Sequence, residues 1–82
     1  MTPDRRTWID RYANALGVEE LPEEDVEALL ALASTAAHAS ERTAAPLSCW
    51  LAAKAGIPPA DALAVAQELA REIGRASCRE RV

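Results

Sequence analysis

The chain has 82 residues, 27% of them charged, and a net charge of −4, a size that allows one small domain. Alanine dominates its apolar residues, and the aromatic side chains are Trp8, Tyr12 and Trp50. The negative charge argues against general nucleic-acid binding, and no apolar run is long enough to span a membrane. We therefore expect a cytoplasmic, single-domain, all-α protein without a signal peptide or a membrane association.

The first predicted helix spans residues 3–16, where apolar side chains recur at helical spacing. Pro3 suits the first turn of this helix and Thr2 is a suitable cap residue. Gly17 is the expected stop, because glycine accepts the left-handed conformation that ends many helices.

Three further helices are predicted over 22–41, 46–55 and 59–72. Pro46 is expected to open the third helix and Gly56 to end it. No segment alternates between apolar and polar residues with a period of two, so no strand is predicted. Four helices joined by short connections favour a compact four-helix bundle.

The core of this bundle is expected to depend on a few large side chains, because alanine-rich faces bury little area each. Trp8 and Trp50 could stack a ligand, but burial is the more common role of such residues. On that interpretation, Leu29→Ala and Trp50→Ala should be among the most destabilising substitutions, since a large buried side chain contributes roughly 1.5–3 kcal/mol.

The last ten residues, 73–82, differ from the rest of the chain. They hold three of the nine basic residues and one of the two cysteines, and Gly74 interrupts the apolar pattern. The segment resembles the conceptual translation of a common sequencing adapter; the alternative is a natural basic tail for an acidic or phosphate-bearing partner. We therefore predict a native helical domain over 1–72, cut short at its end, and a non-native tail over 73–82.

Without that tail the domain carries six basic and twelve acidic residues, a net charge of −6. Its only cysteine is Cys49, which is expected to be a small buried side chain. No disulfide and no cysteine-based metal site is expected within the domain.

The densest polar cluster lies at the predicted end of the second helix. His38, Glu41 and Arg42 are three and four residues apart, so a helix would place them on one face. Together with free N–H groups at the start of the third helix, His38 and Arg42 would form a binding site for a small anionic ligand or a nucleotide. The plainer interpretation is a helix end where Glu41 pairs with Arg42 and His38 caps a carbonyl.

Other site chemistry finds little support in the sequence. His38 and Glu41 supply two metal ligands, but no third ligand follows at a suitable spacing, so no metal is expected. A single histidine does not provide for a catalytic triad, and there is no glycine-rich phosphate loop. These observations predict a protein that is not an enzyme and that holds no cofactor.

Two charged groups remain as candidate docking faces. Arg5, Arg6 and Arg11 give the first helix a mild basic face, which we expect to pair with acidic neighbours rather than with nucleic acid. An acidic run precedes and opens the second helix; such a run either docks a basic partner or forms a solvated helix start. It comprises Glu19, Glu20, Glu23, Glu24, Asp25 and Glu27.

Several stretches of the chain resemble a small actinobacterial helical domain of unknown function. The resemblance covers most of residues 5–70, and its most specific part is His-x-x-Glu-Arg followed by Ala-Pro-Leu, within residues 37–48. The other matching stretches are Trp8-Ile9-Asp10, Ala15-Leu16-Gly17, Leu29-Leu30-Ala31-Leu32-Ala33 and Trp50-Leu51.

That domain occurs alone or fused to the C-terminal side of proteins like molybdenum cofactor guanylyltransferase, which attaches a nucleotide to molybdopterin. The resemblance implies an accessory domain in molybdenum cofactor biosynthesis whose partner is a nucleotidyltransferase-like protein, and it supplies no activity. If its motif marks a functional surface, that surface comprises His38, Glu41, Arg42, Pro46 and Leu47. A structural interaction domain unrelated to molybdenum is the remaining alternative, and the sequence indicates no oligomeric state.

Overall fold

The chain folds into four helices, and the second of them is central because it packs against both the third and the fourth. The computed structural model describes the backbone of residues 2–81 and the side chains of residues 2–74. The helices are α1 (Arg5–Leu16), α2 (Glu23–Ala39), α3 (Ala44–Ala55) and α4 (Pro59–Arg81), and the described residues contain no strand. The predicted all-α bundle of four helices is confirmed.

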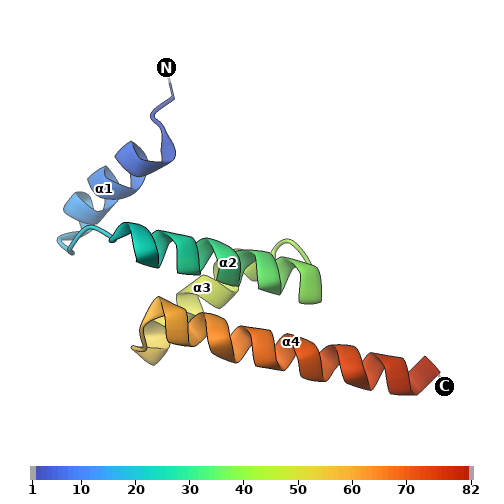
Figure 1. Cartoon of the computed structure of the whole chain (residues 1–82). Coiled ribbons are helices and arrows are strands. Elements are labelled where there is room, and N and C mark those ends of the chain that lie inside the picture. Colours follow the sequence, from blue (N-terminus) through green and yellow to red (C-terminus); the bar gives the residue numbers. More distant parts are fainter. Residues whose placement is uncertain (1, 82) are drawn as a thin grey trace.

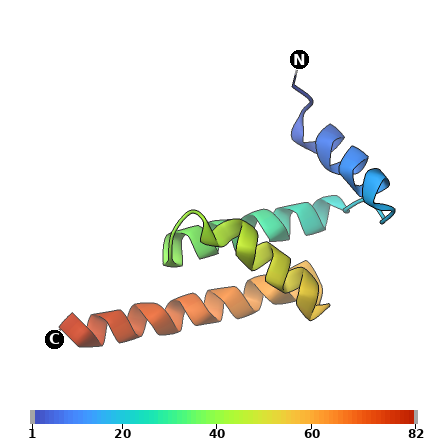
Figure 2. The same ribbon diagram turned by 180° about the vertical axis from the view of Figure 1, so that it is seen from behind.

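α2 and α4 lie side by side and run in the same direction, while α3 returns across one side of this pair (Figures 1 and 2). α1 leaves the start of α2 and points away from the other three helices (Figure 1). The molecule is therefore elongated, with extents of 51 × 30 × 18 Å. Its radius of gyration is 15.0 Å, against about 12 Å for a compact domain of this length.

α1 begins at Arg5, two residues later than predicted, because Asp4 rather than Thr2 caps it. The Asp4 carboxylate accepts a hydrogen bond of 2.7 Å from the Thr7 backbone N–H, which otherwise has no partner within the helix. The predicted stop is confirmed: Gly17 has a φ of 77° and its N–H bonds to carbonyls of the last turn.

The boundary between α2 and α3 differs from the prediction on both sides. α2 ends at Ala39 and not at residue 41, because Ser40 leaves the helix with φ −132° and ψ −101°. α3 starts at Ala44, two residues before Pro46, so the proline lies inside the first turn, where its missing N–H costs nothing. Gly56, with a φ of 72°, ends α3 as predicted.

α4 extends beyond the predicted end at residue 72 and passes through Gly74 to Arg81. A glycine inside a helix costs only about 0.5–1 kcal/mol relative to alanine, which neighbouring turns can offset. The predicted end at residue 72 was wrong, because Gly74 does not interrupt the helix. The helical conformation of this segment does not test whether residues 73–82 are native, so their non-native origin stays a prediction.

Small and medium side chains form the core, and the tryptophans do not. The buried apolar residues are Ala13, Val26, Leu32 and Ala62, whereas Trp8 and Trp50 are 57% and 67% exposed. The expected burial of both tryptophans is therefore wrong.

The geometry of α1 and α3 explains this exposure. α3 turns the half-buried Ser48, Cys49 and Ala52 inward, so Trp50 lies on the outer side of the helix. α1 packs against none of the other described helices, and Trp8 stacks only on Tyr12, with ring centroids 5.8 Å apart. Within residues 2–81, no helix has the length and apolar character needed to cross a membrane.

Candidate interaction surface

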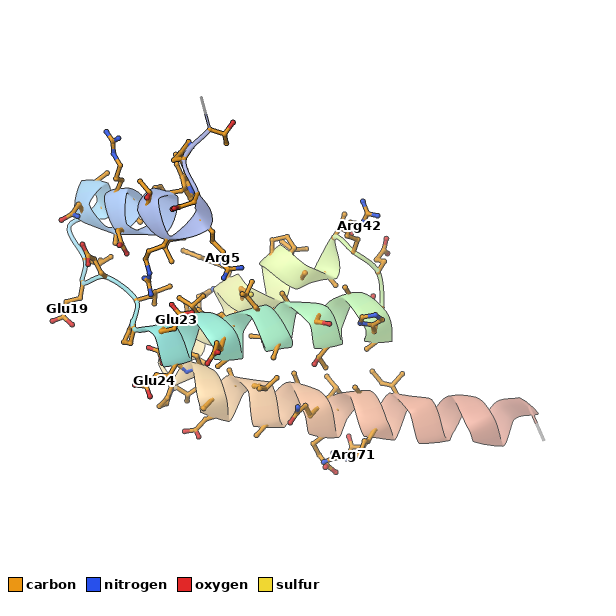
Figure 3. The ribbon with its side chains drawn as sticks, turned by 45° about the horizontal axis from the view of Figure 1, so that its top comes forward. Arg5, Glu19, Glu23, Glu24, Arg42 and Arg71 are labelled. Atoms are coloured by element: carbon orange, nitrogen blue, oxygen red, sulfur yellow. The ribbon has the colours of Figure 1, made fainter. Side chains whose placement is uncertain are left out.

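The predicted functional residues gather at the turn between α2 and α3, and all five are exposed. His38 lies in the last turn of α2, Glu41 and Arg42 lie in the connection, and Pro46 and Leu47 lie in the first turns of α3. Figure 3 shows Arg42 pointing away from the bundle at this connection. We call these five residues the α2–α3 turn surface.

His38 is held against its own helix. Its Nδ1 lies 2.8 Å from the carbonyl oxygen of Ser34 and 3.3 Å from the Ser34 hydroxyl oxygen. A proton on Nδ1 therefore donates to the carbonyl one turn earlier, which is the local capping role that the sequence allowed for. His38 also lines an open hollow of about 550 Å³ between the end of α2 and α4, together with residues such as Ala70 and Ile73. Arg42 does not line this hollow.

Glu41 and Arg42 do not share a helix face with His38, because α2 ends before them. Among the described side chains, the ion pairs are Arg6–Asp10, Arg6–Glu23 and Arg71–Glu68, so Glu41 and Arg42 form none. Both charges are exposed to solvent. The turn thus carries separate positive and negative charges and no preformed polar site.

The backbone at the start of α3 offers few donors to an anion. The Ala44 N–H donates to the Glu41 carbonyl over 2.9 Å, and the Ala45 N–H donates to the Arg42 carbonyl over 3.2 Å. Pro46, the next residue, has no N–H. The anion-binding alternative therefore lacks the free backbone groups on which it depended.

A second surface was missed in the sequence. α3 exposes Trp50 and Leu51 by 67% and 62%, and α4 exposes Val65 and Leu69 by 63% and 53%. We call these four residues the α3–α4 face. Leu51, Val65 and Leu69 border a groove of about 280 Å³ between the two helices, with Leu32 among its lining residues.

The signal for this face was present in the pattern of α3. Leu47, Trp50 and Leu51 follow one another at intervals of three and four, and Ser48, Cys49 and Ala52 follow the same spacing on the opposite side. α3 thus has two apolar sides, of which one can pack on α2. We expected burial of Trp50 on one side and of Cys49 on the other.

Cys49 is part of the packing between α3 and α2. Its Sγ lies 3.9 Å from the Leu29 carbonyl oxygen, and burial raises the pKa of its thiol. A raised pKa keeps the thiol protonated at neutral pH, so Cys49 is not an activated nucleophile. The described residues contain no group of three metal-ligating side chains.

The fold and these surfaces define a small all-helical domain whose large apolar side chains are mostly uncovered. The chain belongs to the family described as domain of unknown function DUF6457, which matches residues 2–78 and so takes in part of the segment after residue 72. No curated protein and no solved structure matches the chain.

Proposed function

We propose that this domain is a non-enzymatic interaction module that binds a protein partner. The observation that carries the proposal is the exposure of large apolar side chains. Thirteen of them are exposed within residues 2–74, and none of the large side chains there is fully buried. Exposed apolar surface on this scale is typical of protein interaction sites and costly for a protein that works alone.

The α2–α3 turn surface is the proposed docking site for this partner. It places the exposed Pro46 and 64%-exposed Leu47 beside the charges of Glu41 and Arg42. Apolar contact area bordered by charged groups is the usual composition of a protein interface, in which the charges contribute orientation and specificity. His38, bonded to Ser34, forms a fixed edge of this surface.

The proposed partner is a nucleotidyltransferase-like protein of molybdenum cofactor biosynthesis. This finer proposal rests on the resemblance of residues 37–48 to the accessory domain found fused to molybdenum cofactor guanylyltransferase-like proteins. In support of it, the most specific residues of that stretch lie together on the exposed turn surface. In this role the domain docks onto the enzyme and makes or breaks no bond itself.

Titration calorimetry of the full chain against purified molybdenum cofactor guanylyltransferase from the same genome tests the proposal. We expect binding that the double variant His38→Ala, Arg42→Ala weakens by roughly tenfold or more, as loss of interface side chains commonly does. Arg5→Ala is the matched control, because Arg5 is an exposed arginine on α1 and lies outside the turn surface. Its affinity should equal that of the wild type.

Two results would overturn parts of this proposal. Absence of binding to the guanylyltransferase would remove the link to molybdenum cofactor assembly and favour an unrelated structural interaction role. Equal binding by wild type and the double variant would remove the α2–α3 turn surface from the interface. A change of tryptophan fluorescence on adding guanine nucleotides to the chain alone would instead support the small-ligand alternative.

A further inference from the structure

The α3–α4 face adjoins the α2–α3 turn surface along α3, because Leu47 of the turn surface lies four residues before Leu51 on the same side of the helix. Trp50, Leu51, Val65 and Leu69 are each more than half exposed, and the groove between their helices is open. α3 and α4 contact each other far less than either contacts α2, so none of the described helices closes this groove. We propose that a second copy of this chain covers the α3–α4 face, forming a two-fold symmetric dimer.

The accessible surface of the single chain is large enough to form one half of a dimer interface. The chain exposes 6558 Å², whereas a compact monomer of its 8.8 kDa mass exposes about 4,800 Å². The excess, on the order of 1,800 Å², is distributed over the molecule, and a stable interface of standard size requires about 800 Å² from each partner. The chain therefore has enough surplus surface to contribute one half of such an interface.

The charges around the face favour a copy of the same chain over a partner of a single charge sign. α3 carries one charged residue, Lys54, beside Trp50 and Leu51. On α4, Asp61 and Glu72 lie four and seven residues from Val65 and therefore share a helical stripe with it. α3 thus carries one positive charge, whereas the described part of α4 carries three acidic side chains and one basic one, Arg71.

A two-fold axis brings the opposite charges of α3 and α4 from two copies together. When α3 of one copy lies over α4 of the other, Lys54 faces the acidic edge of the partner copy, and the same contact recurs across the axis. The apolar residues of both copies then meet between these charged edges, where water is excluded. The net charge of −4 per copy opposes association only weakly, because six of the 13 acidic residues lie elsewhere, before and at the start of α2.

Sedimentation equilibrium of the full-length chain, without any partner protein, tests the inference. We expect a mass of two chains at micromolar concentration. Leu51→Glu should raise the dimer dissociation constant by roughly 100-fold, because each copy would bring an unpaired carboxylate into the apolar centre of the interface. Leu51 is 62% exposed in the single chain, so this variant should keep the wild-type far-ultraviolet circular dichroism.

Leu16→Glu is the matched control, because Leu16 is 58% exposed on α1, away from the α3–α4 face. It introduces the same charge on a similarly exposed leucine and should leave the dimer intact. A Lys54→Glu variant should weaken the dimer by roughly tenfold at low salt, and added salt should reduce the difference from wild type.

Three results would overturn the inference: a wild-type chain that stays monomeric, a Leu51→Glu variant that dimerises like the wild type, or equal loss of the dimer in Leu16→Glu. The outcome is independent of the proposed partner. A dimer that fails to bind the guanylyltransferase would leave this inference standing, and a monomer that binds it would leave the proposed function standing.

Discussion

Arg6 and Glu23, 17 residues apart in the chain, form an ion pair that joins α1 to α2, with Nη2 and Oε1 separated by 3.0 Å. The other terminal nitrogen of Arg6 donates to Asp10 Oδ1 over 3.1 Å and to the Leu21 carbonyl over 2.8 Å. One guanidinium therefore links α1, the connecting segment and the start of α2. The hydrogen bonds to Asp10 and Glu23 raise the pKa of Arg6, so its guanidinium is charged at neutral pH.

Arg6→Ala should loosen α1 without unfolding the other three helices, because α1 has no helix packed against it within the described residues. Amide hydrogen exchange should become faster across residues 5–16 and stay unchanged in α2 and α3. Arg5→Ala is the control, since Arg5 forms no ion pair with the described side chains. Equal exchange in wild type and Arg6→Ala would show that the ion pair does not hold α1 in place.

Acid should weaken the cap of α1. The hydrogen bond from the Thr7 N–H lowers the pKa of Asp4 below the ordinary aspartate value of about 3.9. Because this pKa is lower in the folded than in the unfolded chain, the cap stabilises α1 above the ordinary value, and the stabilisation is lost as pH falls through the lowered one.

Nuclear magnetic resonance can follow this titration at the Thr7 amide proton, whose chemical shift should change at a pH below about 3.9. Asp4→Asn is the matched variant, because asparagine also caps helices but does not titrate. Its Thr7 amide should show no such transition. A wild-type transition at the ordinary aspartate value would mean that the cap is absent in solution.

Stability should depend on Leu32 far more than on the larger Trp8. Leu32 is 3% exposed at the centre of α2, and Leu32→Ala should lower the free energy of unfolding by about 2–5 kcal/mol. Trp8 is 57% exposed, so Trp8→Ala should change it by less than about 1 kcal/mol. Urea unfolding followed by circular dichroism measures both. The reverse order would indicate that Trp8 is buried in solution.

Two glycine substitutions should have opposite effects. Gly74 lies within α4, and an added Cβ there meets nothing within 4 Å, so Gly74→Ala should stabilise the helix by about 0.5–1 kcal/mol. Gly56 ends α3 with a φ of 72°, which alanine adopts only with strain, so Gly56→Ala should destabilise by about 1 kcal/mol. Thermal unfolding distinguishes them. A loss of helicity in Gly74→Ala would contradict the continuation of α4 through this position.

Local signals in the sequence located the helices well. Gly17 and Gly56 ended α1 and α3 where predicted, because a glycine stop depends on the φ angle of one residue and on bonds within one turn. The number and order of helices followed from the same kind of information. The errors at Ala39 and Ala44 are also local, since the hydrogen bonds of Ala44 and Ala45 to the preceding turn set where α3 begins.

The helix–helix packing, by contrast, was decided by the tertiary structure. Trp8, Trp50 and Leu32 are all apolar residues at helical spacing, and only the arrangement of the helices determines that Leu32 is covered and the tryptophans are not. A two-sided helix such as α3 can bury one side against α2, and its sequence does not say which. The candidate residues from His38 to Leu47 are close in sequence, but α2 ends too early for His38, Glu41 and Arg42 to share a helix face. The Arg6–Glu23 pair and the α3–α4 face join segments that are distant in sequence. The spacing of apolar residues shows which side of a single helix can be buried. Whether that side is buried depends on which other helix packs against it.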